Sequence, residues 1–262
     1  MSYAFMDLGL SAALFLLMLA MLLLGASMGR RRREKVGTEV SGAGAVDGAV
    51  YALLGLLVAF TFSGAASRFD ERRSLIVEEA NDIGTAYLRL DLLPADAQPG
   101  LRDLMRRYTE SRLKVYQTLP DLEASYEELA LSQQLQSQIW TRALEASRRP
   151  GQDTAATMLL LPALNAMFDI TTTRTMASLK HPPKAIFGML FAICLLGAML
   201  AGFNMGLGGR VSLLHAVTFP AVMSIAVNLI LDMEHPRLGL ITVDSFDQVI
   251  ADTLANMTPK PD

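Results

Sequence analysis

The chain has 262 residues, of which 52% are hydrophobic and only 19% are charged, and its formal net charge is −3. Charged residues usually make up about a quarter of a soluble domain, so this composition argues against a protein that is soluble along its whole length. The near-neutral balance gives no nucleic-acid footprint, since such binding would need a clustered basic face. The one cysteine, Cys194, excludes an intrachain disulfide and any multi-cysteine metal site.

Four windows contain no Asp, Glu, Lys or Arg, and each is at least 20 residues long. About 20 apolar helical residues cross a hydrocarbon core of roughly 30 Å. The windows therefore predict four membrane-spanning helices. They lie between Asp7 and Arg30, Asp47 and Arg68, Lys184 and Arg210, and Arg210 and Asp232.

The spacing of these windows predicts the organisation of the chain. Residues 1–66 hold spans one and two, which "RRRREK" and a Gly/Ala-rich linker, "GTEVSGAGAVDG", separate. Residues 67–184 form a soluble insert, 185–232 hold spans three and four, and 233–262 form a C-terminal tail. Spans three and four make a tight hairpin around "GLGGR".

The insert is predicted to be helical throughout. Its first helix, to about residue 92, continues span two with no turn signal between them. Further helices are expected over about 96–118, from a cap at Asp121 to about 148, and over about 152–180 with a kink at Pro162. No strand-like alternation or internal repeat is present, so the predicted fold class is an all-α membrane protein.

The membrane orientation of the insert stays open. Five Lys or Arg residues follow the first span and none precedes it, which favours a cytoplasmic end there and an external insert. Several cations also flank the insert and nearly balance this bias: Arg68, Arg72, Arg73, Lys180 and Lys184.

One face of span two changes from apolar to hydroxylated toward the insert. Residues spaced by three or four make up this face: Ala52, Leu56, Phe60, Ser63 and Ser67. Copies of such a helix around an axis would form a hydrophobic constriction that gates by dewetting, with a polar mouth. The alternative is an ordinary packed span whose serine hydroxyls bond back to the helix.

A polar cluster is predicted at the membrane exit. It comprises Arg68, Asp70, Arg72, Arg73, Glu79 and Asn81 after span two, and Asp169 and Arg174 before span three. We expect either Arg72 or Arg73 to pair with Asp169, or Glu79 to pair with Arg174. The cluster could serve as an ion vestibule or be a salt-bridged, solvated face.

Catalytic chemistry has no support in the sequence. The histidines, His181, His215 and His235, are in separate contexts without metal-ligand spacing. There is no nucleophile elbow, phosphate-binding loop or Cys/His pair. We expect neither an enzyme nor a cofactor or metal.

The layout and three motifs resemble the bestrophin-like membrane protein family of bacteria, distant relatives of the bestrophin anion channels. The motifs are "GLLVAFTFSGAASRFDERRSLIVEEANDIGTAYLRLDLLP", "LNAMFDITTTR" and "HPRLGLI". The resemblance implies a homopentamer in the bacterial inner membrane, with span two lining one central pore for inorganic ions. Aligning Arg68 with the arginine of the bestrophin "RWW" motif puts Ala52, Leu56 and Phe60 at the neck.

The departures from that family concern the neck and the tryptophans. This chain has "RFD" in place of "RWW", and Ala52 would leave a wider ring at the outermost neck position. No acidic calcium clasp matches residue by residue. Bestrophins hold their insert in the cytosol, opposite to the side that the charges favour here. The leading hypothesis is an oligomeric ion channel; the alternative is a non-conducting membrane scaffold or sensor whose insert binds a partner.

Overall fold

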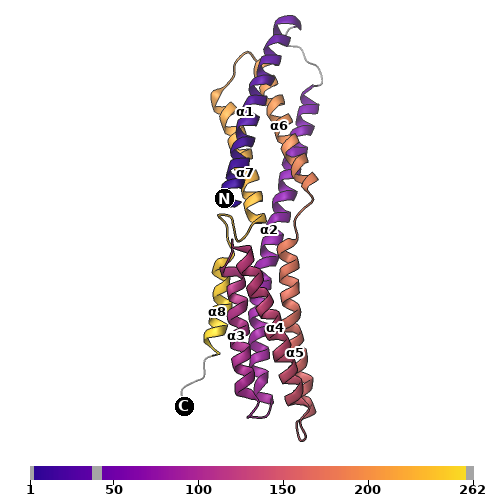
Figure 1. Cartoon of the computed structure of the whole chain (residues 1–262). Coiled ribbons are helices and arrows are strands. Elements are labelled where there is room, and N and C mark those ends of the chain that lie inside the picture. Colours follow the sequence, from indigo (N-terminus) through magenta and orange to yellow (C-terminus); the bar gives the residue numbers. More distant parts are fainter. Residues whose placement is uncertain (1–2, 37–42, 258–262) are drawn as a thin grey trace. The chain divides into compact units, whose positions relative to one another are not determined.

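The computed structural model of the chain describes residues 3–36 and 43–257. These residues form helices and no strands (Figure 1), so the predicted all-α class is confirmed. The last residues of the predicted tail and the first half of the Gly/Ala-rich linker lie outside the described residues. The helices are α1 (Tyr3–Val36), α2 (Ala43–Arg89), α3 (Gln98–Gln117), α4 (Leu122–Ser147), α5 (Thr154–Leu179), α6 (Lys184–Leu207), α7 (Leu213–Glu234) and α8 (Asp247–Ala255), with short 3-10 turns at Leu90–Leu92 and Asp244–Phe246.

Four segments of the described chain are long and apolar enough to cross a membrane, in agreement with the four predicted spans. The chain divides into two compact units. The membrane unit comprises Met1–Phe69 and His181–Ile241, and the insert unit comprises Asp70–Lys180 and Thr242–Asp262. The chain passes from the first to the second within α2, which is one uninterrupted helix as predicted.

In the membrane unit, α1 packs against α6 and α7. Two glycines on each helix bring the backbones of α1 and α6 into contact. A methyl group added at Gly202 would collide with the carbonyl oxygen of Leu22, and one at Gly206 with that of Ala26. Conversely, methyl groups at Gly25 and Gly29 would collide with carbonyl oxygens of α6. Small residues spaced by four allow this approach between membrane helices.

The membrane unit is apolar both inside and outside. Leu14, Met18 and Leu22 of α1 are at most 1% exposed in its core. Leucines on other faces of α1, such as Leu16 and Leu23, are 63% and 60% exposed. A soluble protein rarely exposes such a contiguous apolar surface, whereas a bilayer covers it, so the exposure pattern agrees with a multi-pass membrane protein.

In the insert unit, the end of α2 packs with α3, α4 and α5 around one hydrophobic core. Ile83, Leu90, Met105 and Ile139 are fully buried there. Asp121 caps α4 as predicted, and its carboxylate accepts the backbone N–H of Ala124 at 3.2 Å. Within the predicted C-terminal tail, Asp247–Ala255 form α8, which packs against α3.

Candidate functional site

The apolar-to-hydroxylated face of α2 is exposed along its whole length in the membrane unit. All five predicted pore residues (Ala52, Leu56, Phe60, Ser63 and Ser67) are exposed. Leu56 is 52% exposed and Phe60 67%, high values for large apolar side chains. The face therefore has no covering partner among the described residues of the chain.

The opposite side of α2 is the one that packs inside the membrane unit. Leu54 is 2% exposed and Ala65 is fully buried. The Tyr51 hydroxyl donates to the carbonyl oxygen of Gly197 on α6 at 3.1 Å. At about 100° per residue, the five exposed positions span about 80° of the helix, and Leu54 and Ala65 lie about 160–180° from its middle. The predicted face thus points away from α6.

The apolar segment of α2 is also the least buried of the four. Only 11% of its most apolar window is buried, against 28% in each of the other three segments. A groove of about 240 Å³ runs beside the exposed face, between α2 and the start of α6. Phe60, Gly64 and Arg68 form part of its wall. This side of α2 therefore leaves room for groups from outside the protomer.

Arg68, the first residue of the predicted polar cluster, pairs inside the membrane unit with a residue that sequence reasoning missed. Its guanidinium contacts the carboxylate of Glu234, at the end of α7, with Nε 3.0 Å from Oε1. Glu234 is 4% exposed. The Nδ1 atom of His181 lies 3.3 Å from the other carboxylate oxygen. One buried carboxylate thus joins α2, α7 and the segment that leads into α6.

A second histidine–carboxylate pair lies next to the first. His235 Nδ1 is 3.1 Å from Oδ2 of Asp7, near the start of α1. The ring centroids of His181 and His235 are 5.9 Å apart. The expectation that these histidines lie in separate contexts is therefore wrong. The sequence signal was available, since each precedes a proline beside a span end, but which span ends meet depends on the tertiary fold.

The "HPRLGLI" motif folds back on the end of α7. Both carboxylate oxygens of Asp232 are used there, accepting the backbone N–H groups of Leu240 and Ile241 at 2.7 Å each. Gly239 leaves space for that carboxylate, because a Cβ atom at this position would lie 2.5 Å from Oδ1. The motif therefore has a structural role: it binds the Asp232 carboxylate at the end of α7.

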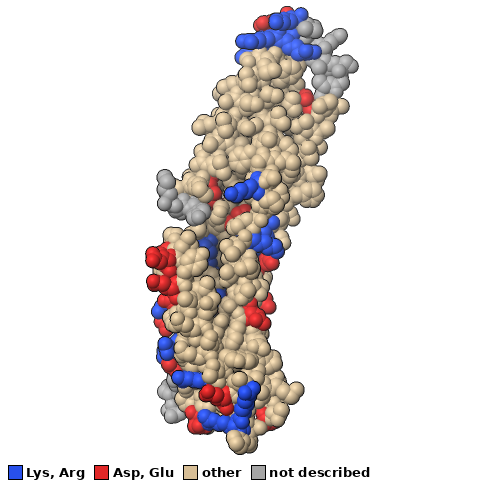
Figure 2. All heavy atoms as spheres, turned by 45° about the vertical axis from the view of Figure 1, so that its right-hand side comes forward, with Lys and Arg blue, Asp and Glu red and all other residues tan. Residues whose placement is uncertain are grey.

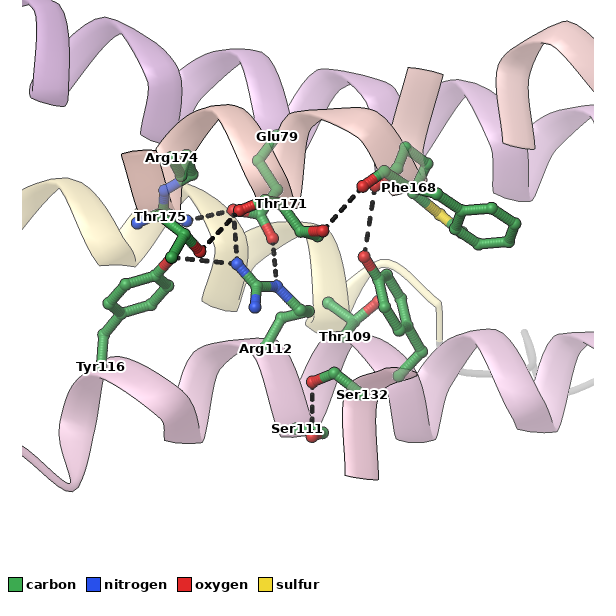
Figure 3. A network of polar contacts seen from close by, with 12 residues as sticks. Glu79, Thr109, Ser111, Arg112, Tyr116, Ser132, Phe168, Thr171, Arg174 and Thr175 are labelled. Atoms are coloured by element: carbon green, nitrogen blue, oxygen red, sulfur yellow. Dashed lines mark hydrogen bonds and ion pairs between the residues drawn. The ribbon is translucent and has the colours of Figure 1, made fainter. Parts of the chain in front are cut away.

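The rest of the predicted polar cluster belongs to the insert unit, where Glu79 lies at the centre of a buried network (Figure 3). Glu79 and Arg112 are both fully buried, and Arg112 Nε donates to Glu79 Oε1 at 2.5 Å. Arg174 binds the other oxygen of Glu79, which confirms the predicted Glu79–Arg174 pair. The ring of Tyr116 lies against Arg174, 4.0 Å from ring centroid to guanidinium carbon.

These two arginines stabilise the ionised form of Glu79. Burial raises the pKa of a carboxyl, but Arg112 and Arg174 more than offset this and keep the pKa of Glu79 below its ordinary value. Asp82, one turn further along α2, shows the opposite direction. Partial burial, together with Glu78 and Glu79, raises its pKa.

The other predicted members of the cluster are dispersed. Arg72 is buried and donates to the carbonyl oxygens of Ala177 and Lys180. Arg73 pairs with Asp70 at 3.0 Å. Asp169 is exposed, and no ion pair joins its carboxylate to a described residue, so the expected pairing with Arg72 or Arg73 is not formed.

Asn81 is exposed too and lines a separate, shallow pocket with Thr85 and Asn256. Within residues 3–36 and 43–257, no group of three or more His, Cys, Asp or Glu side chains is arranged to hold a metal ion.

Comparison with known proteins identifies a sequence family and a fold. The sequence profile of the Bestrophin-like domain matches residues 11–245. A search among curated proteins returns no match.

Solved structures of a bacterial bestrophin homologue from Klebsiella pneumoniae have the same fold. The chain is 17% identical to a tryptophan-to-alanine variant of that homologue over 95% of this chain and 97% of that one, with a TM-score of 0.73. For a tyrosine-to-alanine variant the identity is 17%, the coverage 93% and 97%, and the TM-score 0.70. For the structure phased with zinc the values are 18%, 94% and 97%, and 0.65.

Proposed function

Because the chain belongs to the Bestrophin-like domain family, we propose that it forms an oligomeric ion channel, a homopentamer, in the bacterial inner membrane. The family and the four apolar segments support a multi-pass membrane protein of the ion-channel type. The observation that carries the finer proposal is the exposed face of α2, which no other helix covers in the described part of its own protomer. Around a central axis, five copies of that face would enclose a pore.

Ala52, Leu56 and Phe60 form the constriction in this proposal. A ring of Leu and Phe side chains holds no continuous water when it is narrow, so ions cross only when the ring widens. The fold accommodates this role because the large side chains at 56 and 60 are both exposed on the face that points away from α6. Transport is passive, since the sequence has no nucleotide-binding motif to supply energy.

Ser63 and Ser67 form the polar mouth of the pore, on the same exposed face. Hydroxyls that faced lipid would lack partners other than their own helix, whereas at a water-filled mouth they are solvated. The side chains of Thr61 and Ser27 show the alternative, because each bonds back to carbonyl oxygens of its own helix. Neither Ser63 nor Ser67 makes such a bond within the described chain, which favours the solvated mouth.

Single-channel recording of the purified protein in planar bilayers tests the constriction. Leu56→Ala and Phe60→Ala remove apolar bulk from the ring, so each variant should conduct more current than the parent chain. Phe62→Ala is the matched control, since residue 62 is on the same helix but about 200° around it from residue 60. Unchanged current in both ring variants, or an equal rise in the control, would overturn the assignment.

The oligomeric state separates the channel from a non-conducting scaffold or sensor. Images of the detergent-solubilised protein should show a five-fold ring with an axial passage. A monomer or dimer without an axial cavity would instead support the scaffold. The side of the insert is measured separately, by labelling Ser137→Cys at an exposed insert position with a membrane-impermeant reagent; the native Cys194 is buried.

A further inference from the structure

The end of α1 carries a cluster of cations that the proposed pore does not use. The helix continues past its apolar segment through Arg30, Arg31, Arg32, Arg33 and Lys35, and all five side chains are exposed. None of them forms an ion pair with a described residue. Figure 2 shows blue Lys and Arg side chains gathered at the end of the membrane unit, with some red acidic side chains among them.

The hairpin between α6 and α7 adds to the same surface. Gly209 has a φ of +77°, and a Cβ atom there would overlap the guanidinium of Arg33, so that group lies against the hairpin backbone. The next residue, Arg210, is exposed. Among the described residues, the acidic side chains nearby are Glu34, within the run, and Asp47, which accepts a hydrogen bond from Asn204 at 2.7 Å. Positive charge therefore predominates at this end of the membrane unit.

The apolar side chains next to the cations are exposed as well. Leu24 is 49% exposed and Met28 47%. Residues three and four apart lie on one side of a helix, so Leu24, Met28 and then Arg31 and Arg32 follow one another along α1. This stripe changes from exposed apolar side chains to guanidinium groups within one helical turn. A phospholipid has its acyl chains and its charged headgroup in the same order.

We propose that the basic end of α1, together with Arg210, binds the headgroups of anionic phospholipids. The lipid phosphate would accept hydrogen bonds from Arg31 and Arg32, and the acyl chains would lie along Leu24 and Met28. Arginine suits this role better than lysine, because its planar guanidinium donates two parallel hydrogen bonds to a phosphate. Four of the five cations in the run are arginine. The site is separate from the face of α2 and does not depend on conduction.

Native mass spectrometry of the full-length protein in detergent tests the proposal with two lipids, dioleoylphosphatidylglycerol and dioleoylphosphatidylcholine. We expect tighter binding of the anionic lipid, weakened by added salt. Each juxtamembrane cation contributes about fivefold to such binding, so the Arg31→Gln/Arg32→Gln variant should lose about 30-fold in affinity for phosphatidylglycerol. The weak affinity for phosphatidylcholine should be the same in this variant as in the parent chain.

The matched control is Arg106→Gln/Arg107→Gln, an adjacent pair of exposed arginines in the insert unit. It should change the affinity for phosphatidylglycerol by less than about twofold, which is well below the fivefold loss expected for each cation of the site. Two further variants keep the test decisive if the first one folds poorly. Arg31→Lys/Arg32→Lys retains the charge and most of the affinity, and Arg210→Gln loses about fivefold without altering α1.

Three results would overturn the proposal. Equal affinity for the two lipids would mean that the cations only set the topology of the span. An unchanged affinity in both the Arg31/Arg32 double glutamine variant and Arg210→Gln would exclude these residues. Displacement of the lipid by millimolar inorganic phosphate would indicate a site for free phosphate, since an acyl-anchored headgroup resists that competition.

Discussion

The Glu79 carboxylate and the Arg112 guanidinium form an ion pair in which both side chains are fully buried, with Nε 2.5 Å from Oε1. Arg174 binds the second carboxylate oxygen, so one anion balances two cations in the insert core. The pair joins α2 to α3, and Arg174 adds α5. Removing the anion leaves two buried positive charges without this counter-charge.

Glu79→Gln should therefore destabilise the insert unit strongly. Breaking a buried ion pair by removing one partner costs about 3–5 kcal/mol, because the other charge stays buried without compensation. The thermal midpoint, followed by circular dichroism in detergent, should fall well below that of the parent chain. Glu78→Gln, at the exposed neighbouring position, is the control and should change the midpoint little. Equal midpoints for the two variants would contradict the account.

The pH dependence of stability follows from the lowered pKa of Glu79. A carboxyl whose pKa is lower in the folded chain stabilises it fully above the unfolded-state value, about 4.3. That contribution is lost as the pH falls through the lower, folded-state pKa. The stability gap between the parent chain and Glu79→Gln should thus stay constant from pH 7 to 5 and shrink in more acidic solution. A gap that narrowed between pH 7 and 5 would refute the sign of the shift.

Asp82 should behave in the opposite way. Its pKa is raised by partial burial and by its acidic neighbours Glu78 and Glu79, so the ionised form destabilises the folded chain at neutral pH. Asp82→Asn should raise the thermal midpoint at pH 7. The gain should decrease as the pH falls and vanish below about 3.9, where the carboxyl is protonated in both states. A lower midpoint at pH 7 would count against this prediction.

Gly202→Ala should weaken the contact between α1 and α6. The added methyl group collides with the backbone carbonyl oxygen of Leu22, and overpacking of this kind costs about 1–3 kcal/mol. Gly188→Ala on the same helix meets nothing within 4 Å and should be neutral or slightly stabilising, since alanine favours helix. Thermal unfolding of the two variants in detergent gives the comparison. If Gly202→Ala is as stable as Gly188→Ala, the helices do not pack through these backbones.

Glu234→Gln tests the charge beside the proposed pore mouth. The variant removes the carboxylate that pairs with Arg68, so one positive charge per protomer loses its counter-charge directly after Ser67. Rings of positive charge favour anions in pores. In a potassium chloride gradient, the reversal potential should therefore shift toward that of chloride. Glu145→Gln, at an exposed position of α4 in the insert unit, is the control. A shift toward potassium would be inconsistent with this placement.

The helical architecture was predictable from local patterns. Charge-free windows located the spans, and the absence of any turn signal around Arg68 predicted that α2 runs on without a break. Asp121 correctly predicted the start of α4, because helix capping is a local interaction. Glu79 and Arg174 were paired correctly because each belongs to a helix adjoining a span.

The missed partners are long-range contacts. Arg112 is one of several arginines on α3, and only the packing of that helix selects it to face Glu79. Asp7 and His235 are 228 positions apart in the sequence, and no local rule brings two span ends together. Gly25 with Gly29 and Gly202 with Gly206 repeat at a spacing of four, but the sequence does not say which helix faces which.

The glycine contacts between α1 and α6 also bear on motion. Where backbones touch directly, no side chain lies between them to change rotamer, so the helices move as one piece or separate altogether. We therefore expect α1 and α6 to form the rigid part of the membrane unit. α2 meets α6 through larger side chains such as Tyr51 and Leu54 and has the least buried apolar segment. In the proposed channel, we therefore expect α2 to be the helix that tilts or rotates during gating, while α1 and α6 stay packed together.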